Sequence, residues 1–537
     1  MRSRIPISGL EEADVAAPRD TQRFRARLTL AIVLVGAALR LVYVDRPLDH
    51  RMRSPWRQSD YTQLARNYWR EDPNLFHPRI DWRRDGPGLV EMEFPLIPWT
   101  AGMLYKLFGY HEAILRALSA ALEIASLLLF AGLARRLLPE PAALAATAFY
   151  AANPLLIYLS TAMQPEPLML FFSLLAVLLI VRWDRTGSTA TLLLGGAALG
   201  GAILAKAPAA YLGLVFAFVI LRRSGLGALK DLRVWSAAVL ALAPPVAWYL
   251  WARRFWILYG NSLGLSNENP FLGLDMLRHP GWVLGLLKWE TLVVLMPLGW
   301  ILLLAAFRAP RSATALPFAW LGAAWILLIA SAASTADDWA FYYHSIAIAP
   351  ACLVMGAGIA ALCSPEPARV LGLPPGHLRQ GVGTALAAAM ILLLAAATVV
   401  VIRARDSRDD LKMMRACGLL FVKQIPPEGQ IVVRGGPTHG RYGNPLAHDR
   451  PMLFAWLDRK GFTYADEELS ISMLAGMAAR GGRYWIAEAD ELRGPFRREV
   501  AEHFRLLDDC EPGYSLYDLQ SKPVIGLGPT RGGLDVK

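Results

Sequence analysis

Long apolar runs separated by short polar connections make up most of the chain up to residue 404. A helix needs about 20 predominantly apolar residues to cross a bilayer. Windows of that size predict about eleven membrane-spanning helices, at residues 27–44, 111–134, 140–158, 166–183, 189–205, 207–221, 233–251, 283–307, 315–334, 342–362 and 380–402. A single lysine, Lys206, separates the fifth from the sixth, so these are either two spans or one tight helical pair.

A shorter apolar stretch, residues 94–108, follows the first predicted span. It contains Trp99, Tyr105 and Lys106, which favour the boundary between lipid headgroups and acyl chains. The composition predicts an interfacial helix within a first outer loop of residues 45–110, called the first loop below. If this stretch crosses the membrane instead, every later loop changes side.

The pattern changes after residue 404. Apolar runs shorten to strand length in QIVVRGG and RYWIAEAD, and they alternate with helical patterns in EELSISMLAGMAARG and FRREVAEHFRLL. Residues 405–520 are therefore expected to form a soluble α/β domain, followed by a flexible tail at 521–537. The chain is predicted to be a polytopic α-helical membrane protein, with an N-terminal tail (1–26), a transmembrane module (27–404) and this C-terminal domain.

Composition agrees with a membrane protein, and the charges indicate its orientation. Hydrophobic residues make up 55% of the 537 residues and the mean hydropathy is +0.34, which is too apolar for a soluble protein. The N-terminal tail and alternate connections are rich in Arg, whereas the opposite connections near 160–166 and 334–341 contain no Lys or Arg. The positive-inside rule then predicts a cytoplasmic N-terminus, with the first loop and the C-terminal domain in the periplasm or another extracytoplasmic space.

The net charge of +11 is explained by this topology and by attraction to anionic membrane lipids, so we expect no nucleic-acid partner. The high Ala, Arg and Leu content is typical of bacteria and favours a bacterial inner membrane. No GxxxxGK[ST] loop is present, and the glycines of GAGIAA (356–361) fall inside an apolar span, where they favour close helix packing. A lipid-borne substrate fits this architecture better than a soluble nucleotide-activated donor.

The first loop concentrates ionisable residues at the edge of the bilayer. Between Asp45 and Glu93 it contains nine Arg, nine Asp or Glu, and three Trp. Such groups are costly at a membrane and mark functional sites. We interpret the segment as an active-site loop whose key carboxylate is Asp60. A solvated loop with balanced charge and no chemistry is the alternative.

Five segments, taken in order, resemble the GT-C glycosyltransferases, in particular the branch with the protein O-mannosyltransferases, the lipid A aminoarabinose transferase and the rhizobial galacturonosyltransferases. They are WRQSDYTQLARNYW (56–69), EMEFPLIPWTAGMLYKLFG (91–109), MQPEPLMLFF (163–172), AKAPAAYLG (205–213) and FYYHSIAIAPACLVMGAG (341–358). The resemblance implies an inverting transfer of a sugar from a polyprenyl phosphate to a hydroxyl group on a lipid, glycan or protein. Many relatives carry an Asp-Glu pair in the first loop, where this chain reads RQSD. The assignment of the base to Asp60 therefore rests on the QLARNYW segment that follows.

Such a transfer needs a general base for the acceptor hydroxyl, and Asp60 is the candidate. Alternatively, Asp60 is an N-cap at the start of the helix YTQLARNYW. Arg57 either keeps Asp60 ionised or binds the donor phosphate. Glu91 and Glu93 bind a divalent cation or the acceptor, or they are two exposed loop acids. The need for a cofactor thus stays open.

Cations near the outer face are the candidates for binding the lipid phosphate, and the implied set is Lys206, His344, Arg57 and Arg116. Lys206 lies between two apolar runs, where it either binds the phosphate or extends its side chain to the headgroups. His344 lies at the mouth of a span, after Tyr342 and Tyr343. These tyrosines either line the site or form an interfacial aromatic belt.

Two acids complete the candidates. Glu166 begins a predicted span and either lines the site or stabilises the N-terminus of that helix. Asp338, beside Asp337, either contacts sugar or metal or is solvated.

The four cysteines divide between the two parts of the chain. Cys417 and Cys510 both belong to the C-terminal domain and can form a disulfide in an oxidising compartment. Cys352 and Cys363 lie in or beside a span and are interpreted as packing residues.

Other functions remain open. A polytopic transporter or lipid flippase would contain broken helices and an inverted repeat, but no second copy of the first loop is present in the sequence. A transferase of another lipid-carried group and a non-catalytic scaffold are further alternatives.

Overall fold

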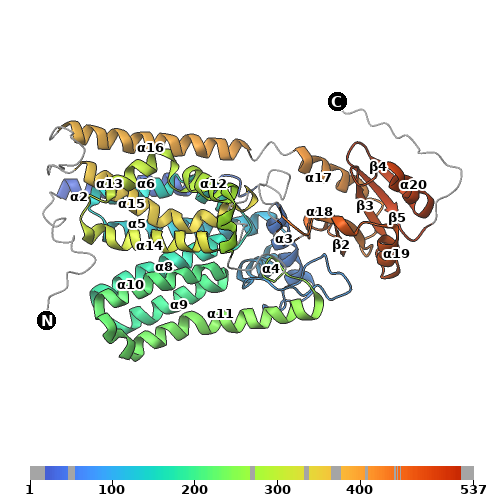
Figure 1. The fold of residues 1–537 in the computed structure, drawn as a ribbon, viewed down its shortest axis with the longest axis horizontal. Helices are drawn as coiled ribbons and strands as arrows, with labels where there is room; N and C mark the ends of the chain where they lie inside the picture. The colour runs from blue at the N-terminus through green and yellow to red at the C-terminus, as the bar shows by residue number, and fades with distance from the viewer. Residues whose placement is uncertain are drawn as a thin grey trace.

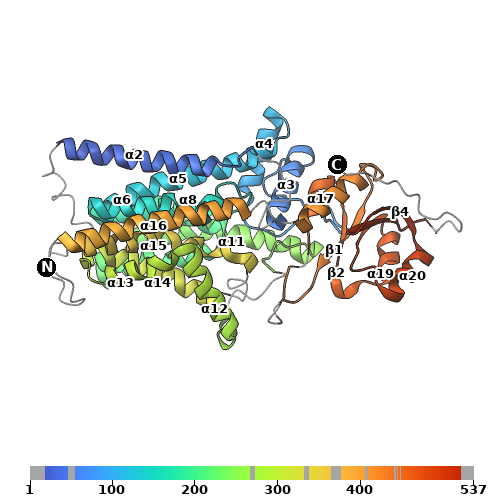
Figure 2. The same ribbon diagram turned by 90° about the horizontal axis from the view of Figure 1, so that it is seen from above.

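A helix bundle and a smaller sheet domain lie at opposite ends of an elongated molecule (Figure 1). The structure is a computed structural model that describes residues 19–45, 55–266, 273–331, 338–363, 377–404, 409–440, 443, 445–447 and 449–521. Two helices of the first loop, α3 (Pro55–Arg70) and α4 (Leu96–Phe108), lie beside the end of the bundle that faces the sheet domain (Figures 1 and 2). We call this end of the bundle the loop end.

The bundle consists of long apolar helices joined by short turns. Its elements are α2 (Arg19–Leu41), α5 (Glu112–Leu137), α6 (Glu140–Ala151), α7 (Pro154–Leu159), α8 (Glu166–Thr186), α9 (Thr189–Ala205), η1 (Ala207–Tyr211), α10 (Leu212–Ser224), η2 (Gly225–Lys230), α11 (Leu232–Tyr259), η3 (Leu274–Arg278), α12 (Pro280–Trp289), η4 (Glu290–Val294), α13 (Met296–Ala306), α14 (Arg311–Ala330), η6 (Asp338–His344), α15 (Ser345–Cys363) and α16 (His377–Ala404).

The protein is a polytopic membrane protein, as the sequence predicts. In the described residues seven helices are long and apolar enough to cross a membrane, or eight if one bent pair forms a single span. Each of the eleven predicted spans coincides with helical segments, but α2, the short pair α6 and α7, and the 17-residue α9 do not meet the test of length and hydropathy. The predicted count of eleven is therefore not confirmed.

The predicted span 140–158 is broken inside the bundle. Helix α6 ends at Ala151, and Asn153 begins α7 by accepting hydrogen bonds from the backbone N–H groups of Leu155 and Leu156. The carbonyl groups freed at the end of α6 are bound by Arg40, whose guanidinium donates to the carbonyl oxygens of Tyr150 and Ala151. Backbone polar groups at membrane depth need such partners because lipid offers none.

The predicted span 283–307 is not one helix. Helix α12 and the π-helical turn η4 meet α13 at an angle of 89°. The bend falls at Met296, whose φ is +57°, immediately before Pro297. Proline removes a backbone donor and disfavours helical geometry in the preceding residue, so the sequence contained a signal for this break.

The first-loop helix α3 is polar yet buried on nearly every side from Pro55 to Tyr68. One side packs on α4, where Gly102 allows close approach, since a Cβ there would lie 2.7 Å from the Cβ of Tyr68. The other side meets the sheet domain, where Gln63 and Arg66 donate to the carbonyl oxygens of Pro451 and Ala455. Helix α3 therefore packs against α4 on one side and against the sheet domain on the other.

The C-terminal domain contains a five-stranded mixed sheet of order β2-β1-β3-β5-β4. Strands β2, β1 and β3 are parallel to one another. Strand β5 pairs antiparallel with β3, and β4 pairs antiparallel with β5. The elements are α17 (Asp409–Phe421), β1 (Ile431–Gly436), α18 (Met452–Leu457), β2 (Gly461–Ala465), η7 (Asp466–Glu468), α19 (Ile471–Ala479), β3 (Tyr484–Glu488), α20 (Gly494–His503), β4 (Arg505–Cys510) and β5 (Tyr514–Asp518).

One helix prediction in this domain extends too far. The pattern FRREVAEHFRLL was expected to be helical throughout, but α20 ends at His503 and residues 505–510 form β4. The turn at 511–513 lets β4 pair with β5 as a hairpin. Sheet pairing, which the local pattern does not reveal, decides the conformation of this segment.

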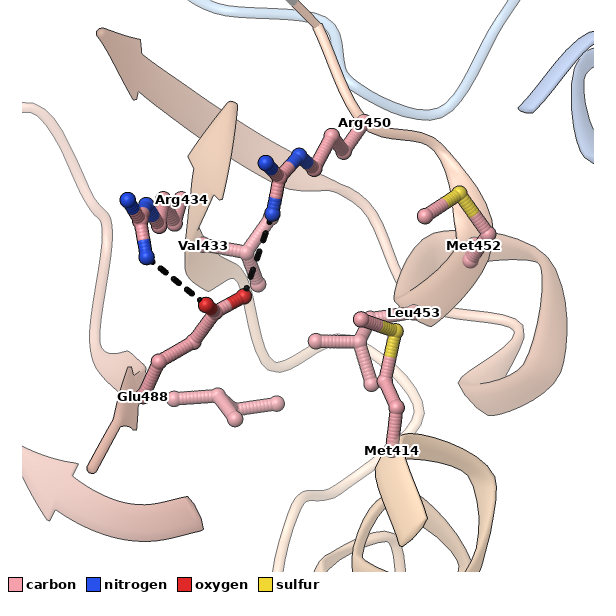
Figure 3. A pocket seen from close by; sticks show the side chains of 8 residues that line it. Met414, Val433, Arg434, Arg450, Met452, Leu453 and Glu488 are labelled. Carbon is pink, nitrogen blue, oxygen red and sulfur yellow. Dashed lines mark hydrogen bonds and ion pairs between the residues drawn. The ribbon is translucent and has the colours of Figure 1, made fainter. Parts of the chain in front are cut away.

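Ion pairs join the carboxyl ends of the parallel strands. Arg434 of β1 binds Asp466, Glu488 and Asp490, and Arg450 lies 3.5 Å from Glu488. Figure 3 shows both arginines directed at Glu488 beside a small pocket that is also lined by apolar side chains. The charges here satisfy one another, so the network is explained by the assembly of the sheet. A disulfide between Cys417 and Cys510, whose Cα atoms are 5.6 Å apart, joins α17 to β4.

The first loop docks on the edge of this sheet. Trp82 forms a parallel β-bridge with Gly461 of the edge strand β2, and the N–H of Gly461 donates to the carbonyl oxygen of Asp81. Glycine at 461 is needed for the pairing of β2 with β1, because a Cβ there would lie 1.8 Å from the carbonyl oxygen of Ile431. The loop thereby covers a sheet edge that would otherwise be open to pairing with other chains.

Candidate active site

A buried group of polar side chains lies at the loop end of the bundle. Its members come from the first loop, from the start of α8 and from the end of α9, and we call them the polar cluster: Arg57, Asp60, Glu93, Gln164, Glu166 and Lys206. All are at most 7% exposed. Buried polar groups are normally paired. In the described part of the chain, however, an atom each of Arg57, Glu93 and Glu166 and both amide atoms of Gln164 lack a hydrogen bond.

Asp60 is the sixth residue of α3, which begins at Pro55, and it is 1% exposed. The alternative that Asp60 is an N-cap is therefore wrong. The indole N–H of Trp82 donates to its Oδ1 over 3.1 Å. Burial raises the pKa of Asp60 to about 8, although Arg57 and the Trp82 hydrogen bond lower it. Arg57 alone thus does not keep Asp60 ionised at neutral pH, but the carboxyl group titrates where a general base is effective.

Arg57 connects three parts of the site. Its Nη2 donates to the carbonyl oxygen of Leu263 over 2.7 Å, and its Nη1 lies 4.0 Å from Oε2 of Glu93. Burial lowers the pKa of Arg57, but Glu93, Tyr342 and Asp60 outweigh burial and raise it overall. Arg57 is therefore a fixed positive charge beside Asp60, with one N–H-bearing nitrogen that makes no hydrogen bond in the described residues.

Lys206 binds Glu166 and is 7% exposed. Its side chain therefore does not extend to solvent or headgroups, which excludes the snorkelling alternative. The ammonium group also lies 4.9 Å and 4.2 Å from the ring centroids of Tyr342 and Tyr343, close enough for cation–π attraction. Glu166 begins α8 and belongs to the polar cluster, so its position is compatible with both roles that the sequence left open.

The elements that carry Glu93 and Lys206 are joined directly. The N–H of Phe94 donates to the carbonyl oxygen of Leu204 over 3.0 Å, so the residues next to Glu93 contact the end of α9. The first loop and the end of α9, which carries Lys206, are far apart in sequence and are in direct contact in the fold.

His344 follows the two tyrosines and is fully buried. Its Nδ1 lies 2.7 Å from Oε1 of Glu290, whose other oxygen accepts a hydrogen bond from Trp325. His344 and Glu290 therefore form a separate pair beside the polar cluster, in the region where α12 and η4 lead to α13. Tyr342 is also buried, so it is not part of an aromatic belt.

Two predicted site residues hold neighbouring segments in place. Arg116 donates to the carbonyl oxygen of Thr161 and so supports the connection that leads to Gln164. Glu91 accepts hydrogen bonds from the hydroxyl groups of Ser262 and Ser266, one on each oxygen.

These contacts decide between the readings of the Glu91–Glu93 pair. Both glutamates are buried, so they are not exposed loop acids. Each oxygen of Glu91 accepts one serine hydrogen bond, and no group of three or more candidate metal ligands occurs in the described residues. Binding of a divalent cation or of the acceptor by the pair stays a prediction. The side chain of Asp338 and all of Asp337 lie outside the described residues.

Three residues of the site were missed from the sequence. Trp82 was noted only as one of three tryptophans, and Glu290 lies in an apolar run. Asp449, whose charge raises the pKa of Asp60, belongs to the distant C-terminal domain. A lone acid within an apolar span is a recognisable signal, so Glu290 was detectable. Nothing in the local sequence distinguishes Trp82 or Asp449.

Comparison with known proteins agrees with this geometry. A family described as dolichyl-phosphate-mannose-protein mannosyltransferase matches residues 87–251. This stretch contains Glu93, Glu166 and Lys206 but not Asp60. A search of curated protein sequences finds no match.

Solved structures extend the likeness to nearly the whole chain. The crystal structure of ArnT from Cupriavidus metallidurans bound to undecaprenyl phosphate aligns with a TM-score of 0.61 at 16% identity, covering 93% of this chain and 99% of ArnT. The chain has the GT-C fold. Another GT-C structure, the oligosaccharyltransferase AglB from Archaeoglobus fulgidus with an inhibitory peptide and a dolichol-phosphate, aligns with a TM-score of 0.52 at 10% identity, covering 91% of this chain and 73% of AglB.

Proposed function

We propose that this protein is a membrane glycosyltransferase that moves a sugar from a polyprenyl-phosphate donor to a hydroxyl acceptor. The observation that carries the proposal is the convergence of a buried carboxyl group, Asp60, with two buried cations, Arg57 and Lys206, at the loop end of a GT-C bundle. The carboxyl group supplies a base and the cations supply a site for a lipid phosphate.

The comparisons support the donor class. The ArnT structure contains undecaprenyl phosphate and the AglB structure contains a dolichol-phosphate, so both bind a polyprenyl phosphate on this fold. The matched family is described by a dolichyl-phosphate sugar. The sugar and the acceptor of the present chain, whether lipid, glycan or protein, are not identified by these likenesses.

In the proposed reaction the acceptor oxygen attacks the anomeric carbon while Asp60 accepts the hydroxyl proton. The bond between that carbon and the phosphate oxygen breaks, and its electron pair leaves with the polyprenyl phosphate. Attack opposite the leaving group inverts the configuration. Asp60 is ionised to a useful extent only at pH values near or above its pKa of about 8, and a pKa close to the working pH suits a general base.

The cations have to compensate for the negative charge that develops on the phosphate. Arg57 offers an Nη1 that makes no hydrogen bond in the described residues. Lys206 can exchange Glu166 for the phosphate while it stays against Tyr342 and Tyr343. In this scheme His344 supports the same wall of the site from its pair with Glu290, and Arg116 positions the segment before Glu166.

The proposal includes an orientation. The arginines of the N-terminal tail and of alternate connections favour a cytoplasmic N-terminus. The polar cluster and the C-terminal domain then lie on the extracytoplasmic side, the periplasmic face of a bacterial inner membrane.

A transporter or lipid flippase is the competing function. The breaks at Asn153 and Met296 favour it, because transporter sites are built at interrupted helices. The buried base Asp60 and the cations Arg57 and Lys206 at the loop end favour sugar transfer instead.

The test uses the full-length protein in two assays. Undecaprenyl phosphate is the probe for binding, measured by thermal shift, and a radiolabelled polyprenyl-phosphate sugar in membranes reports transfer. We expect Asp60→Asn to bind the lipid but to lose transfer by about 10²-fold or more, and Lys206→Met to lose lipid binding. Asp72→Asn, a first-loop acid bound to His77 and Arg79 outside the cluster, is the matched control.

Undiminished transfer by Asp60→Asn would disprove the assignment of the base. Movement of lipid or solute across proteoliposomes without any sugar transfer would favour the transporter instead.

A further inference from the structure

An acid of the C-terminal domain is buried against the first loop. Asp449 lies between β1 and α18, and its side chain is only 3% exposed. Its Oδ1 accepts a hydrogen bond from the hydroxyl group of Thr463 on β2 and lies 3.5 Å from Nη2 of Arg84 in the first loop. Its Oδ2 is buried and makes no hydrogen bond in the described residues. Leaving a carboxylate oxygen buried and unpaired is costly, so this position requires an explanation.

A continuous set of contacts leads from Asp449 to Asp60. Thr463 lies two residues after Gly461 on the edge strand β2. Gly461 bridges to Trp82 through the backbone, and the indole of Trp82 donates to Asp60. Docking of the sheet domain on the first loop therefore places both carboxyl groups against the same short segment of the chain.

We propose that Asp449 is a positioning residue for Asp60: the docked C-terminal domain brings a second buried carboxylate to the first-loop segment that holds the base through Trp82, and the two carboxyl groups act there as an acid pair. This inference rests on the proposed function only for the name of base. The coupling itself is a property of the folded protein and does not depend on any substrate.

The charges around Asp60 support the coupling. From α3 itself Arg57 favours the ionised form, and from the following loop Trp82 does the same through its hydrogen bond. Glu93 and, from the sheet domain, Asp449 oppose ionisation, while burial opposes it most. A nearby like charge makes Asp60 harder to ionise. Removing the charge of Asp449 therefore lowers the pKa of Asp60.

For the proposed enzyme this coupling links catalysis to domain docking. With Asp449 in place, Asp60 is a stronger base that is ionised less often at neutral pH. Without Asp449, Asp60 is ionised more often but accepts the proton less strongly. A shift of the pH dependence distinguishes this role from a purely structural one.

The experiment measures protonation of Asp60 directly. Dicyclohexylcarbodiimide modifies protonated carboxyl groups in apolar surroundings, and mass spectrometry of the Asp60 peptide gives the extent of modification at each pH. In the wild type we expect the half-point near the pKa of about 8. In Asp449→Asn we expect it lower by about one pH unit, with Asp449→Ser as a second neutral variant.

Two matched variants complete the design. Asp449→Glu keeps the charge and is expected to keep the half-point, and Glu502→Gln removes an exposed acid of the same domain and is expected to change nothing. A half-point in both neutral variants equal to that of the wild type, in protein that elutes as a single species, would overturn the inference. If the shift is found but Asp60→Asn retains transfer, the acid pair stands and the proposed base fails.

Discussion

Replacing Trp82 with phenylalanine removes one hydrogen bond from Asp60 and leaves most of the aromatic bulk in place. The indole N–H donates to Oδ1 over 3.1 Å, and this bond favours the ionised carboxylate. Without it, the pKa of Asp60 rises above its wild-type value of about 8. We therefore expect Trp82→Phe to slow transfer at neutral pH because less of the base is ionised.

The size of the effect follows from the hydrogen bond. A bond to a charged group contributes about 1.5 to 3 kcal/mol, and about 1.4 kcal/mol corresponds to one pKa unit. At the lower end, the pKa of Asp60 rises from about 8 to about 9. At about pH 7.5 the ionised fraction of Asp60 then falls from about one quarter to about one thirtieth. The transfer rate is expected to fall by the same factor, about eightfold. At about pH 10 Asp60 is almost fully ionised in both proteins, so the rates converge.

The assay is the pH dependence of kcat/KM for transfer, which reports the ionisation of the free enzyme. The acidic limb of the Trp82→Phe profile is expected to move to higher pH with an unchanged plateau. Trp99→Phe is the control, because it removes an indole hydrogen bond to the Pro73 carbonyl away from Asp60. An unchanged limb, or an equal loss at every pH, would refute the reasoning.

Three further predictions concern stability. Lys206→Met strands a buried Glu166 carboxylate and should cost about 3 to 5 kcal/mol, whereas the double variant with Glu166→Gln should recover much of this loss in thermal unfolding. Equal stability of the single variant and the wild type would contradict a buried pair. Gly461→Ala, in which the new Cβ would lie 1.8 Å from the Ile431 carbonyl oxygen, should separate β2 from β1 and expose the first loop to protease; unchanged cleavage would contradict the docking. The Cys417–Cys510 disulfide closes a loop of 93 residues. Its loss in Cys417→Ser should lower the free energy of unfolding of the C-terminal domain by about 4 kcal/mol in denaturant unfolding. Reductant should cause the same loss in the wild type and no further loss in the variant.

The helices of the bundle were predictable because a lipid environment imposes long apolar runs. The positions at which these helices are interrupted were harder to predict. Pro154 and Pro297 mark them in the sequence, but proline is tolerated within membrane helices, and Pro245 and Pro350 lie inside α11 and α15. Only packing decides which prolines interrupt a helix.

The site was predictable in its parts but not in its contacts. Asp60, Arg57 and Lys206 stand out because charges beside apolar runs are costly. Helix α3 reads as an amphipathic surface helix, and nothing in PWRQSDYTQLARNYWR indicates that α18 covers its other side. The approach of Asp449 to Asp60 depends on the sheet edge that Trp82 occupies, and no local pattern specifies that pairing.

The attachment of Trp82 to Gly461 has a consequence for biosynthesis. Ribosomes deliver the segment with Asp60 and Trp82 long before the strand with Gly461, and the intervening helices must be inserted into the bilayer in between. A nascent chain that has emerged only as far as α16 already carries Arg57, Glu166 and Lys206 but lacks the strand that holds Trp82 against Asp60. The backbone contacts between Trp82 and Gly461 can therefore form only after the last quarter of the chain has been translated.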